Sequence, residues 1–170
     1  CANGVTTDQM SVTVFSNASP AANAGADQDI CSNNNSTFLT GNTPISPALG
    51  TWTLESGSGT IVSINDPGTQ VTGLGIGNNV FRWTVNNGPC AVGITFDLVT
   101  IHVYDENQAP ANAGPDQSIC SNTPSTSLAG NAPTVPATGT WSLISGQGNI
   151  VSPNNPNSLV TGLGVGANVF

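Results

Sequence analysis

Residues 71–90 read VTGLGIGNNVFRWTVNNGPC, and residues 160–170 repeat the beginning of this stretch as VTGLGVGANVF. Within the first copy, Phe81, Trp83 and Val85 alternate with other side chains along 79–86. A period of two is typical of a β-strand that buries one face and exposes the other. The turn-forming sequence NNGP follows at 86–89. The stretch therefore predicts a half-buried strand that ends in a tight connection.

The repetition extends over the whole chain. At an offset of 89 residues, positions 1–81 align with positions 90–170 without a gap, and more than half of the aligned residues are identical. GTWTLESGSGTIVS at 50–63, for example, matches GTWSLISGQGNIVS at 139–152. A long ungapped period indicates tandem copies of one structural unit. A period of 89 residues is too long for a solenoid repeat and favours small autonomous domains arranged as beads on a string.

The boundaries between beads are predicted from composition. Stretches rich in Pro, Ala and Asn lie at 16–24 and 105–113, and both have the character of linkers. One complete repeat is therefore expected over 20–107. Residues 1–19 are expected to be the C-terminal strand of a preceding repeat, and residues 108–170 a following repeat that stops before its last strands.

An all-β fold is predicted for each repeat. No stretch has an apolar period of 3.6 residues, whereas short alternating runs are separated by Gly, Pro and Asn. About seven strands in about 90 residues are typical of an immunoglobulin-like β-sandwich. In the complete repeat the strands are expected at 27–31, 36–41, 50–56, 60–64, 69–74, 79–86 and 97–105.

The composition argues against several classes of partner. Charged residues make up 6% of the chain, the net charge is -8, and Arg82 is the only cationic residue among Lys and Arg. Nucleic acids and anionic membranes are bound through clusters of Lys and Arg, so neither is an expected partner. No apolar run approaches the roughly 18 residues of a membrane-spanning helix, so membrane insertion is not expected either.

Four cysteines stand at positions 1, 31, 90 and 120, two in each period. Two pairings fit this spacing. A Cys31–Cys90 bridge would close a loop within one bead and stabilise it by about 4 kcal/mol in the chain-entropy model, whereas Cys1–Cys31 and Cys90–Cys120 would join neighbouring beads. We favour Cys31–Cys90, which leaves Cys1 and Cys120 with partners outside the segment and implies an oxidising compartment. Four free buried thiols are the third reading.

Candidate catalytic features are few. The GLGxG motifs at 73–77 and 162–166 are followed by strand-like sequence and no lysine, so they predict a strand connection and not a phosphate-binding loop. His102 is the single histidine, lies on the outward face of its strand, and has Thr13 as its counterpart. Because no acid, base or nucleophile accompanies it in both copies, we expect no catalytic residue and no enzyme.

Two features of the sequence are compatible with ligand binding. Asp105, Glu106 and Asp116 stand at a bead junction, where carboxylates of this kind could bind calcium, although a solvated linker without any cofactor is the default expectation. The aromatic residues could stack on sugars, but they are in phase with apolar strand positions, which favours the core. The expected core aromatics are Trp52, Trp83, Phe81 and Trp141.

Three stretches of the repeat match a known family in their sequence and order. They are NAGPDQSIC at 112–120, GTWSLISGQGNIVS at 139–152 and VTGLGIGNNVFRWTVNNGPC at 71–90. The chain resembles the PKD-like, immunoglobulin-like tandem repeats of giant cell-surface proteins of Bacteroidetes, including gliding-motility adhesins. The resemblance covers the whole chain. It implies secretion to the bacterial cell surface, commonly by the type IX secretion system, and long filamentous arrays. It carries no catalytic residue over.

The expected function is accordingly a structural or adhesive repeat segment of a cell-surface filament, with disulfide-stabilised stalk domains. Its partners would be neighbouring repeats of the same chain, further copies in lateral or end-to-end association, and an extracellular surface or polysaccharide. The alternative is a carbohydrate- or protein-binding accessory module of a secreted multidomain protein. The first is favoured because the copies differ at expected surface pairs such as Glu55/Ile144, Ile64/Pro153 and Gln70/Leu159.

Overall fold

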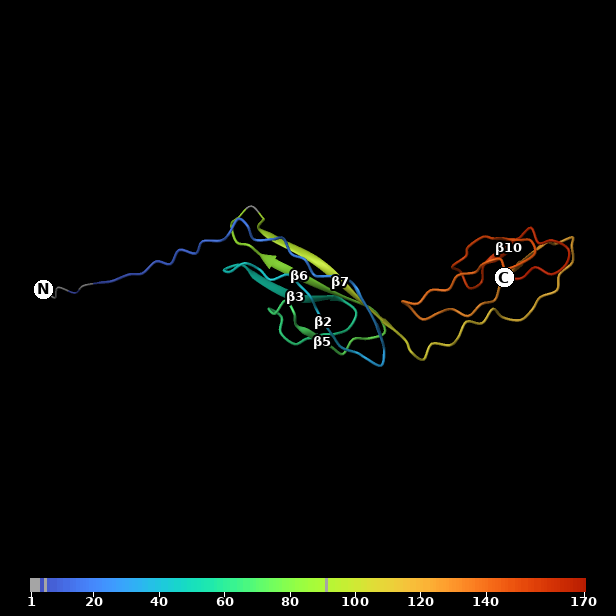
Figure 1. Ribbon diagram of the computed structural model, residues 1–170, viewed down its shortest axis with the longest axis horizontal. Coiled ribbons are helices and arrows are strands. Elements are labelled where there is room, and N and C mark those ends of the chain that lie inside the picture. The colour runs from blue at the N-terminus through green and yellow to red at the C-terminus, as the bar shows by residue number, and fades with distance from the viewer. Residues whose placement is uncertain (1–3, 5, 91) are drawn as a thin grey trace. The chain divides into compact units, whose positions relative to one another are not determined.

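The computed structural model describes residues 4, 6–90 and 92–170 (Figure 1). Every regular element among these residues is a β-strand, and no described segment forms a helix that could cross a lipid bilayer. Contacts between Cα atoms divide the chain into two compact units. The first comprises 1–28, 36–74 and 79–101, and the second comprises 29–35, 75–78 and 102–170.

The first seven strands form a two-layered sandwich. A four-stranded sheet has the order β1-β7-β6-β3, and a three-stranded sheet has the order β2-β5-β4. This arrangement confirms the predicted immunoglobulin-like β-sandwich, in which strands far apart in sequence become neighbours. The strands are β1 Gln28–Cys31, β2 Thr37–Phe38, β3 Leu49–Ser56, β4 Thr60–Ile61, β5 Gln70–Thr72, β6 Gly77–Asn86 and β7 Ile94–Tyr104.

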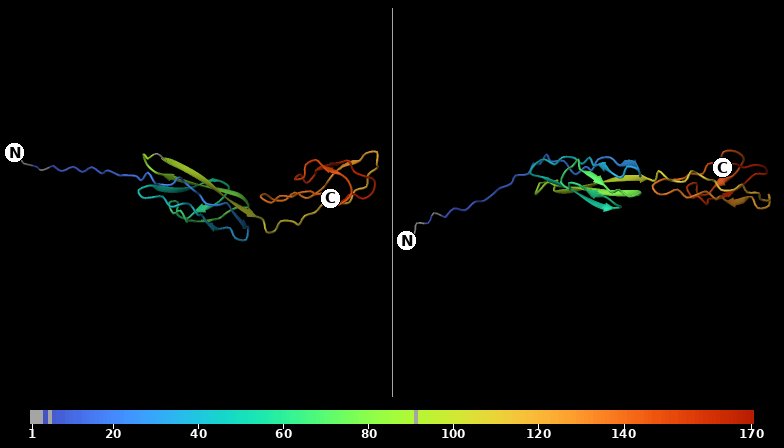
Figure 2. Two further views of the ribbon diagram at one scale, coloured as in Figure 1. Left: turned by 45° about the horizontal axis from the view of Figure 1, so that its top comes forward. Right: turned by 90° about the horizontal axis from the view of Figure 1, so that it is seen from below.

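All seven strands lie where the sequence predicts them, although several differ from the expected length. The three strands of the smaller sheet are only two or three residues long. β7 starts at Ile94, three residues before the predicted start at 97. β6 and β7 are the longest strands and run side by side (Figure 1 and Figure 2).

The core of the sandwich is built by alternation. Along β6, Phe81, Trp83 and Val85 are buried, and along β7 every second residue from Val99 to Val103 is buried. The pairing of β3 with β6 sets Trp52 opposite Trp83. Because each of these side chains faces the second sheet, the two layers close over a continuous apolar core.

The second unit repeats the smaller sheet of the sandwich. Its strands β8 Ser125–Ser127, β9 Asn149–Ile150 and β10 Leu159–Thr161 have the order β8-β10-β9. Leu159 pairs with Ser127, and Gln70 pairs with Phe38 in the equivalent register. The chain is thus repeated in hydrogen-bond register as well as in sequence.

The larger sheet does not form in the second unit. Residues 117–120, which are equivalent to β1, are not in a strand, and only an isolated bridge joins Ser145 to Val169. In the first sandwich β7 lies between β1 and β6. No strand equivalent to β7 lies in the second unit among the described residues, so the two flanking segments have no shared partner there.

Candidate functional site

The aromatic residues of the first sandwich lie in its core. Trp52, Phe81 and Trp83 are each at most 1% exposed, and the Nε1 atom of Trp52 donates hydrogen bonds to the carbonyls of Asp66 and Pro67. Trp141 is half-buried and donates to the equivalent carbonyl of Pro156. The enclosed rings of Trp52, Phe81 and Trp83 offer no face to a sugar. Trp141, predicted as a core residue, instead lines a groove of the second unit.

The cysteines are placed differently from the prediction. Cys31 lies beside the C-terminal end of β7. The amide of the following residue, Ser32, donates a hydrogen bond to the carbonyl of Tyr104 at 2.8 Å. Cys90 precedes the N-terminal end of β7, where its carbonyl accepts from the Gly93 amide at 2.9 Å.

The predicted Cys31–Cys90 bridge therefore does not form, and both residues are free thiols. The 11 residues of β7 span about 33 Å. A disulfide requires Cα atoms within about 7 Å of each other, so the length of the strand separates the two sulfurs. Cys120 is also free and exposed. Cys1 lies outside the described residues.

The acidic candidates at the junction are not gathered into a metal site. An oxygen of Asp105 accepts from the amide of Asn107 at 2.9 Å, and the amide of Glu106 donates to the Ser32 hydroxyl. Asp116 is exposed. Within the described residues, no three side chains among His, Cys, Asp and Glu lie in a group that could hold a metal ion. The expectation of no cofactor, with calcium at this junction as the alternative, stays a prediction.

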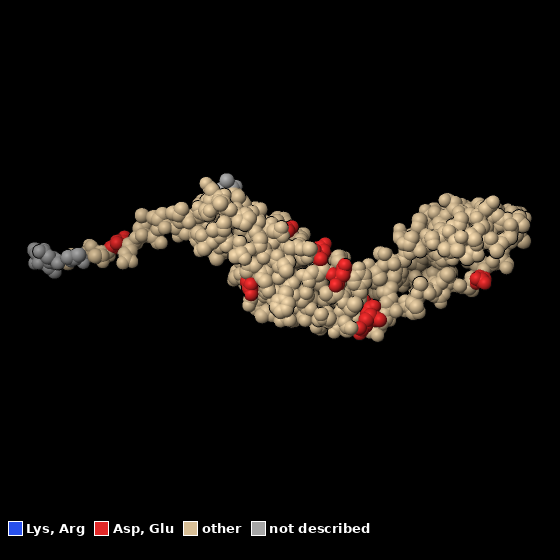
Figure 3. All heavy atoms as spheres, viewed as in Figure 1, with Lys and Arg blue, Asp and Glu red and all other residues tan. Residues whose placement is uncertain are grey.

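His102 and Arg82 have local partners on the outer face of the sandwich. The Nδ1 atom of His102 lies 2.8 Å from the Asn78 side-chain oxygen. The Nε atom of Arg82 lies 3.1 Å from a Glu55 carboxylate oxygen, without hydrogen-bond geometry, and its guanidinium lies 4.1 Å from the centre of the Phe96 ring. Asp and Glu residues are scattered over the face shown in Figure 3. These contacts hold side chains in place and bring no acid–base pair together.

The glycine-rich motif is a connection between the two sheets, as predicted. In the first copy it joins β5 to β6, and Gly73 and Gly77 have φ angles of 68° and 106°. The equivalent glycines, Gly162 and Gly166, have φ angles of 68° and 110°. Residues with a side chain rarely adopt such positive φ angles, which explains why glycine stands at these positions in both copies.

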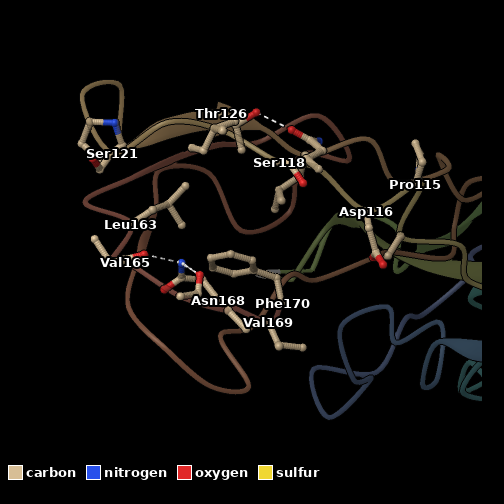
Figure 4. A pocket seen from close by; sticks show the side chains of 18 of the residues that line it. Pro115, Asp116, Ser118, Ser121, Thr126, Leu163, Val165, Asn168, Val169 and Phe170 are labelled. Atoms are coloured by element: carbon tan, nitrogen blue, oxygen red, sulfur yellow. Dashed lines mark hydrogen bonds between the residues drawn. The ribbon is translucent and has the colours of Figure 1, made fainter.

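A large groove lies in the second unit (Figure 4). The ring of Phe170 and the side chain of Leu163 point into it. Its volume is about 680 Å³, and it is lined by residues 113–121, Pro124, Thr126, Leu128, Trp141 and 163–170. The equivalents of several of these apolar residues are buried in the first sandwich, among them Leu39, Trp52, Leu74 and Phe81. The groove is therefore an open core and not a cleft built for a small molecule.

The sequence reasoning missed this groove and the exposed aromatic Phe96. The signal for the groove was present in the repeat, because the buried residues of β7 have no equivalents in residues 108–170. The signal for Phe96 was weaker, since its counterpart is Thr7 and the alternation along β7 assigns it only to the outer face.

Comparison with known proteins gives fold likenesses alone. No family model matches the chain, and no curated protein matches it. A solved structure of the PKD domain from the KIAA 1837 protein has 23% identity and a TM-score of 0.44, covering 65% of this chain and 100% of that one. The PKD domain (329-428) from human KIAA0319 has 20% identity and a TM-score of 0.42, covering 58% and 88%. At these scores the fold assignment rests on the strand order of the present chain and not on the two likenesses.

Proposed function

We propose that this chain is a segment of a long bacterial cell-surface filament, in which its repeats act as stalk and spacing elements of an adhesive array. The observation that carries the proposal is the exact offset of its hydrogen bonds. The amide of Trp52 donates to the carbonyl of Ile64, and the amide of Trp141 donates to the carbonyl of Pro153, 89 residues further along in both cases. A chain that repeats its scaffold in this way is suited to building length.

The exposed positions at which the two copies differ also support a scaffold role. Glu55, Ile64 and the counterparts Ile144 and Pro153 are all exposed, and each pair differs in chemistry. A binding site that every bead used would require the same exposed side chains in both copies. The charge-poor surface is compatible with secretion, which we propose to occur through the type IX system, as the resemblance implies. Disulfide stabilisation by Cys31–Cys90 is not part of the proposal.

The location is tested on intact cells of the source organism with an antibody raised against the purified chain. We expect labelling of unpermeabilised cells and loss of the label after brief protease treatment. Labelling that appears only after permeabilisation would contradict the proposal. The adhesive part is tested separately, by asking whether the same antibody reduces attachment of cells to a surface.

A second function, binding of carbohydrate or protein by an accessory module, is favoured by one observation. Phe96 is 58% exposed on the outer face of β7, and Ile94 and Leu98 are exposed beside it. A glycan array probed with the chain and with Phe96→Ala distinguishes the two functions. Saturable binding that the substitution abolishes would favour the accessory module, whereas absence of binding by both proteins favours the stalk.

A further inference from the structure

Cys31 lies at the end of its repeat from which the chain leaves, here called the exit end. The amide of the next residue, Ser32, donates to the carbonyl oxygen of Tyr104 at 2.8 Å. Tyr104 is the last residue of β7, and the linker to the following repeat starts directly after it. Cys31 is exposed at this place.

Cys90 lies at the opposite end, where the chain enters the repeat, here called the entry end. Its Sγ atom lies 3.4 Å from the carbonyl oxygen of Phe15. The ring of Phe15 also lies against Gly88, two residues before this cysteine. Phe15 comes directly before the linker that leads into the first sandwich. Each of the two cysteines is therefore next to a residue that adjoins a linker.

The two carbonyl groups occupy the same position of the repeat. Phe15 and Tyr104 are 89 residues apart, which is the repeat period. Where one repeat follows another, this carbonyl oxygen would accept from the amide after the Cys31 position of the earlier repeat. The same oxygen would contact the sulfur at the Cys90 position of the later repeat. The exit cysteine of one repeat and the entry cysteine of the next thus meet around a single backbone atom.

The linker keeps these two places close together. On the exit side, the amide of Glu106 donates to the Ser32 hydroxyl at 3.2 Å. On the entry side, the carbonyl of Pro110 accepts from the Asn131 side chain at 3.1 Å. Residues 107–109 separate these two attachment points, and three residues bridge only a short distance. Cysteines form a disulfide when their Cα atoms lie within about 7 Å, so a short connection of this kind favours the bond.

We propose that Cys31 forms a disulfide with the counterpart of Cys90 in the repeat that follows. By the same rule, Cys90 bonds to the counterpart of Cys31 in the repeat that precedes. The pairing differs from Cys31–Cys90 and from Cys90–Cys120, because it joins the exit end of one repeat to the entry end of the next. It rests on the proposed function, since it requires successive repeats in one exported chain.

The bond forms by oxidation of two thiols. Each sulfur gives up its hydrogen, and the two sulfurs join. The two electrons and two protons pass to the disulfide of a thiol oxidoreductase, which is reduced to a dithiol. Compartments outside the cytosol maintain such oxidants, in agreement with the proposed cell-surface location.

A bridge at each junction would give the array a second covalent connection between repeats. Tension along the filament would then be carried by the disulfide as well as by the linker. Cleavage of the linker backbone would leave the two repeats joined. This property suits a stalk that stands outside the cell, where its exposed linkers are accessible to proteases.

The test uses the full protein collected from the surface of the source organism, with free thiols blocked and no reducing agent added. Mass spectrometry of its peptides should find the Cys31 peptide joined to the peptide that holds the next repeat's counterpart of Cys90. DQDICSN at 27–33 and DQSICSN at 116–122 differ in mass, so the repeats are told apart. A Cys31–Cys90 peptide, a Cys90–Cys120 peptide or unbonded thiols at both positions would overturn the proposal.

Substitution in the full protein identifies the partner independently. Cys31→Ser should release one thiol at the next repeat's counterpart of Cys90 and leave Cys90 itself oxidised. Pairing within one repeat would instead release the thiol of Cys90, and this result would refute the proposal. Cys120→Ser is the matched control, which should release a thiol one repeat further along. Cys31 and Cys120 are both exposed, so neither substitution should affect folding.

Cleavage after the exposed Glu106 by a glutamate-specific protease is the second readout. The two products should stay together in electrophoresis without reducing agent and separate after reduction, whereas those of Cys31→Ser should separate in both conditions. Products of the unsubstituted protein that separate without reduction would refute the bridge. Reduced thiols in protein that the antibody labels on intact cells would refute the bridge alone. Bridged protein found only inside cells would refute the surface filament alone.

Discussion

The rings of Trp52 and Trp83 lie with their centroids 4.8 Å apart and their planes tilted by 37°, on directly paired positions of β3 and β6. The backbone makes room for this pair at two glycines. A methyl group added at Gly50 would overlap the ring of Trp83, and one added at Gly41 would come within 2.9 Å of Trp52. The core of the sandwich therefore depends on small residues as much as on large ones.

Gly50→Ala should destabilise the first sandwich by about 1–3 kcal/mol, because the added methyl group displaces the buried Trp83 ring. Gly139→Ala is the matched control in the second unit. There the nearest atoms are those of Pro133 at 3.9 Å, so the free energy of unfolding should hardly change. Urea unfolding followed by tryptophan fluorescence measures both. Equal effects of the two substitutions would refute the packing argument.

Asp97→Ala should cost about 1–3 kcal/mol, because it leaves the amide of the buried Ala24 without its acceptor. Asp29→Ala removes an exposed carboxylate from β1 and should change stability by no more than about 0.5 kcal/mol. Chemical unfolding of both variants, with circular dichroism as the signal, makes the comparison. An Asp97→Ala protein as stable as the parent would show that the hydrogen bond contributes nothing.

The thiols should react at different rates with an alkylating reagent. Cys31 and Cys120 are exposed, whereas Cys90 is half-buried and its Sγ atom lies 3.4 Å from the carbonyl oxygen of Phe15. We therefore expect Cys31 and Cys120 to be modified before Cys90. Mass spectrometry of peptides gives the order. Recovery of a Cys31–Cys90 disulfide peptide from unreduced protein would contradict the separation of these residues by β7.

Gly73→Ala should destabilise the strand connection by about 1–2 kcal/mol, because a side chain is disfavoured at a φ of 68°. Gly73→Asn should cost less, since asparagine tolerates the left-handed region better. Added atoms meet nothing within 4 Å at this position, so any loss comes from the backbone. Gly68→Ala, where φ is not positive, serves as the control in thermal unfolding. Similar losses in all three variants would indicate another cause.

β7 illustrates which features of the site could be predicted from the sequence and which could not. The sequence identifies the apolar faces of β6 and β7 through their alternation, and it identifies the second copy at 5–15 through the repeat. It does not tell which strands are neighbours. The predicted pairing of Cys31 with Cys90 is wrong for this reason. The repeat period suggests that the two cysteines are close in space, whereas the strand order β1-β7-β6-β3 places them at opposite ends of β7.

The sequence by itself determined the strands, the 89-residue period, the core aromatics of the first sandwich and the glycine connections, because each depends on a local pattern of side chains. Only the tertiary structure decided that Cys31 and Cys90 stand at opposite ends of β7, and that residues 117–120 and 166–170 flank an open groove. Strand order is set by contacts between residues far apart in the chain. A local pattern states that a strand buries one face, but not which neighbour covers it.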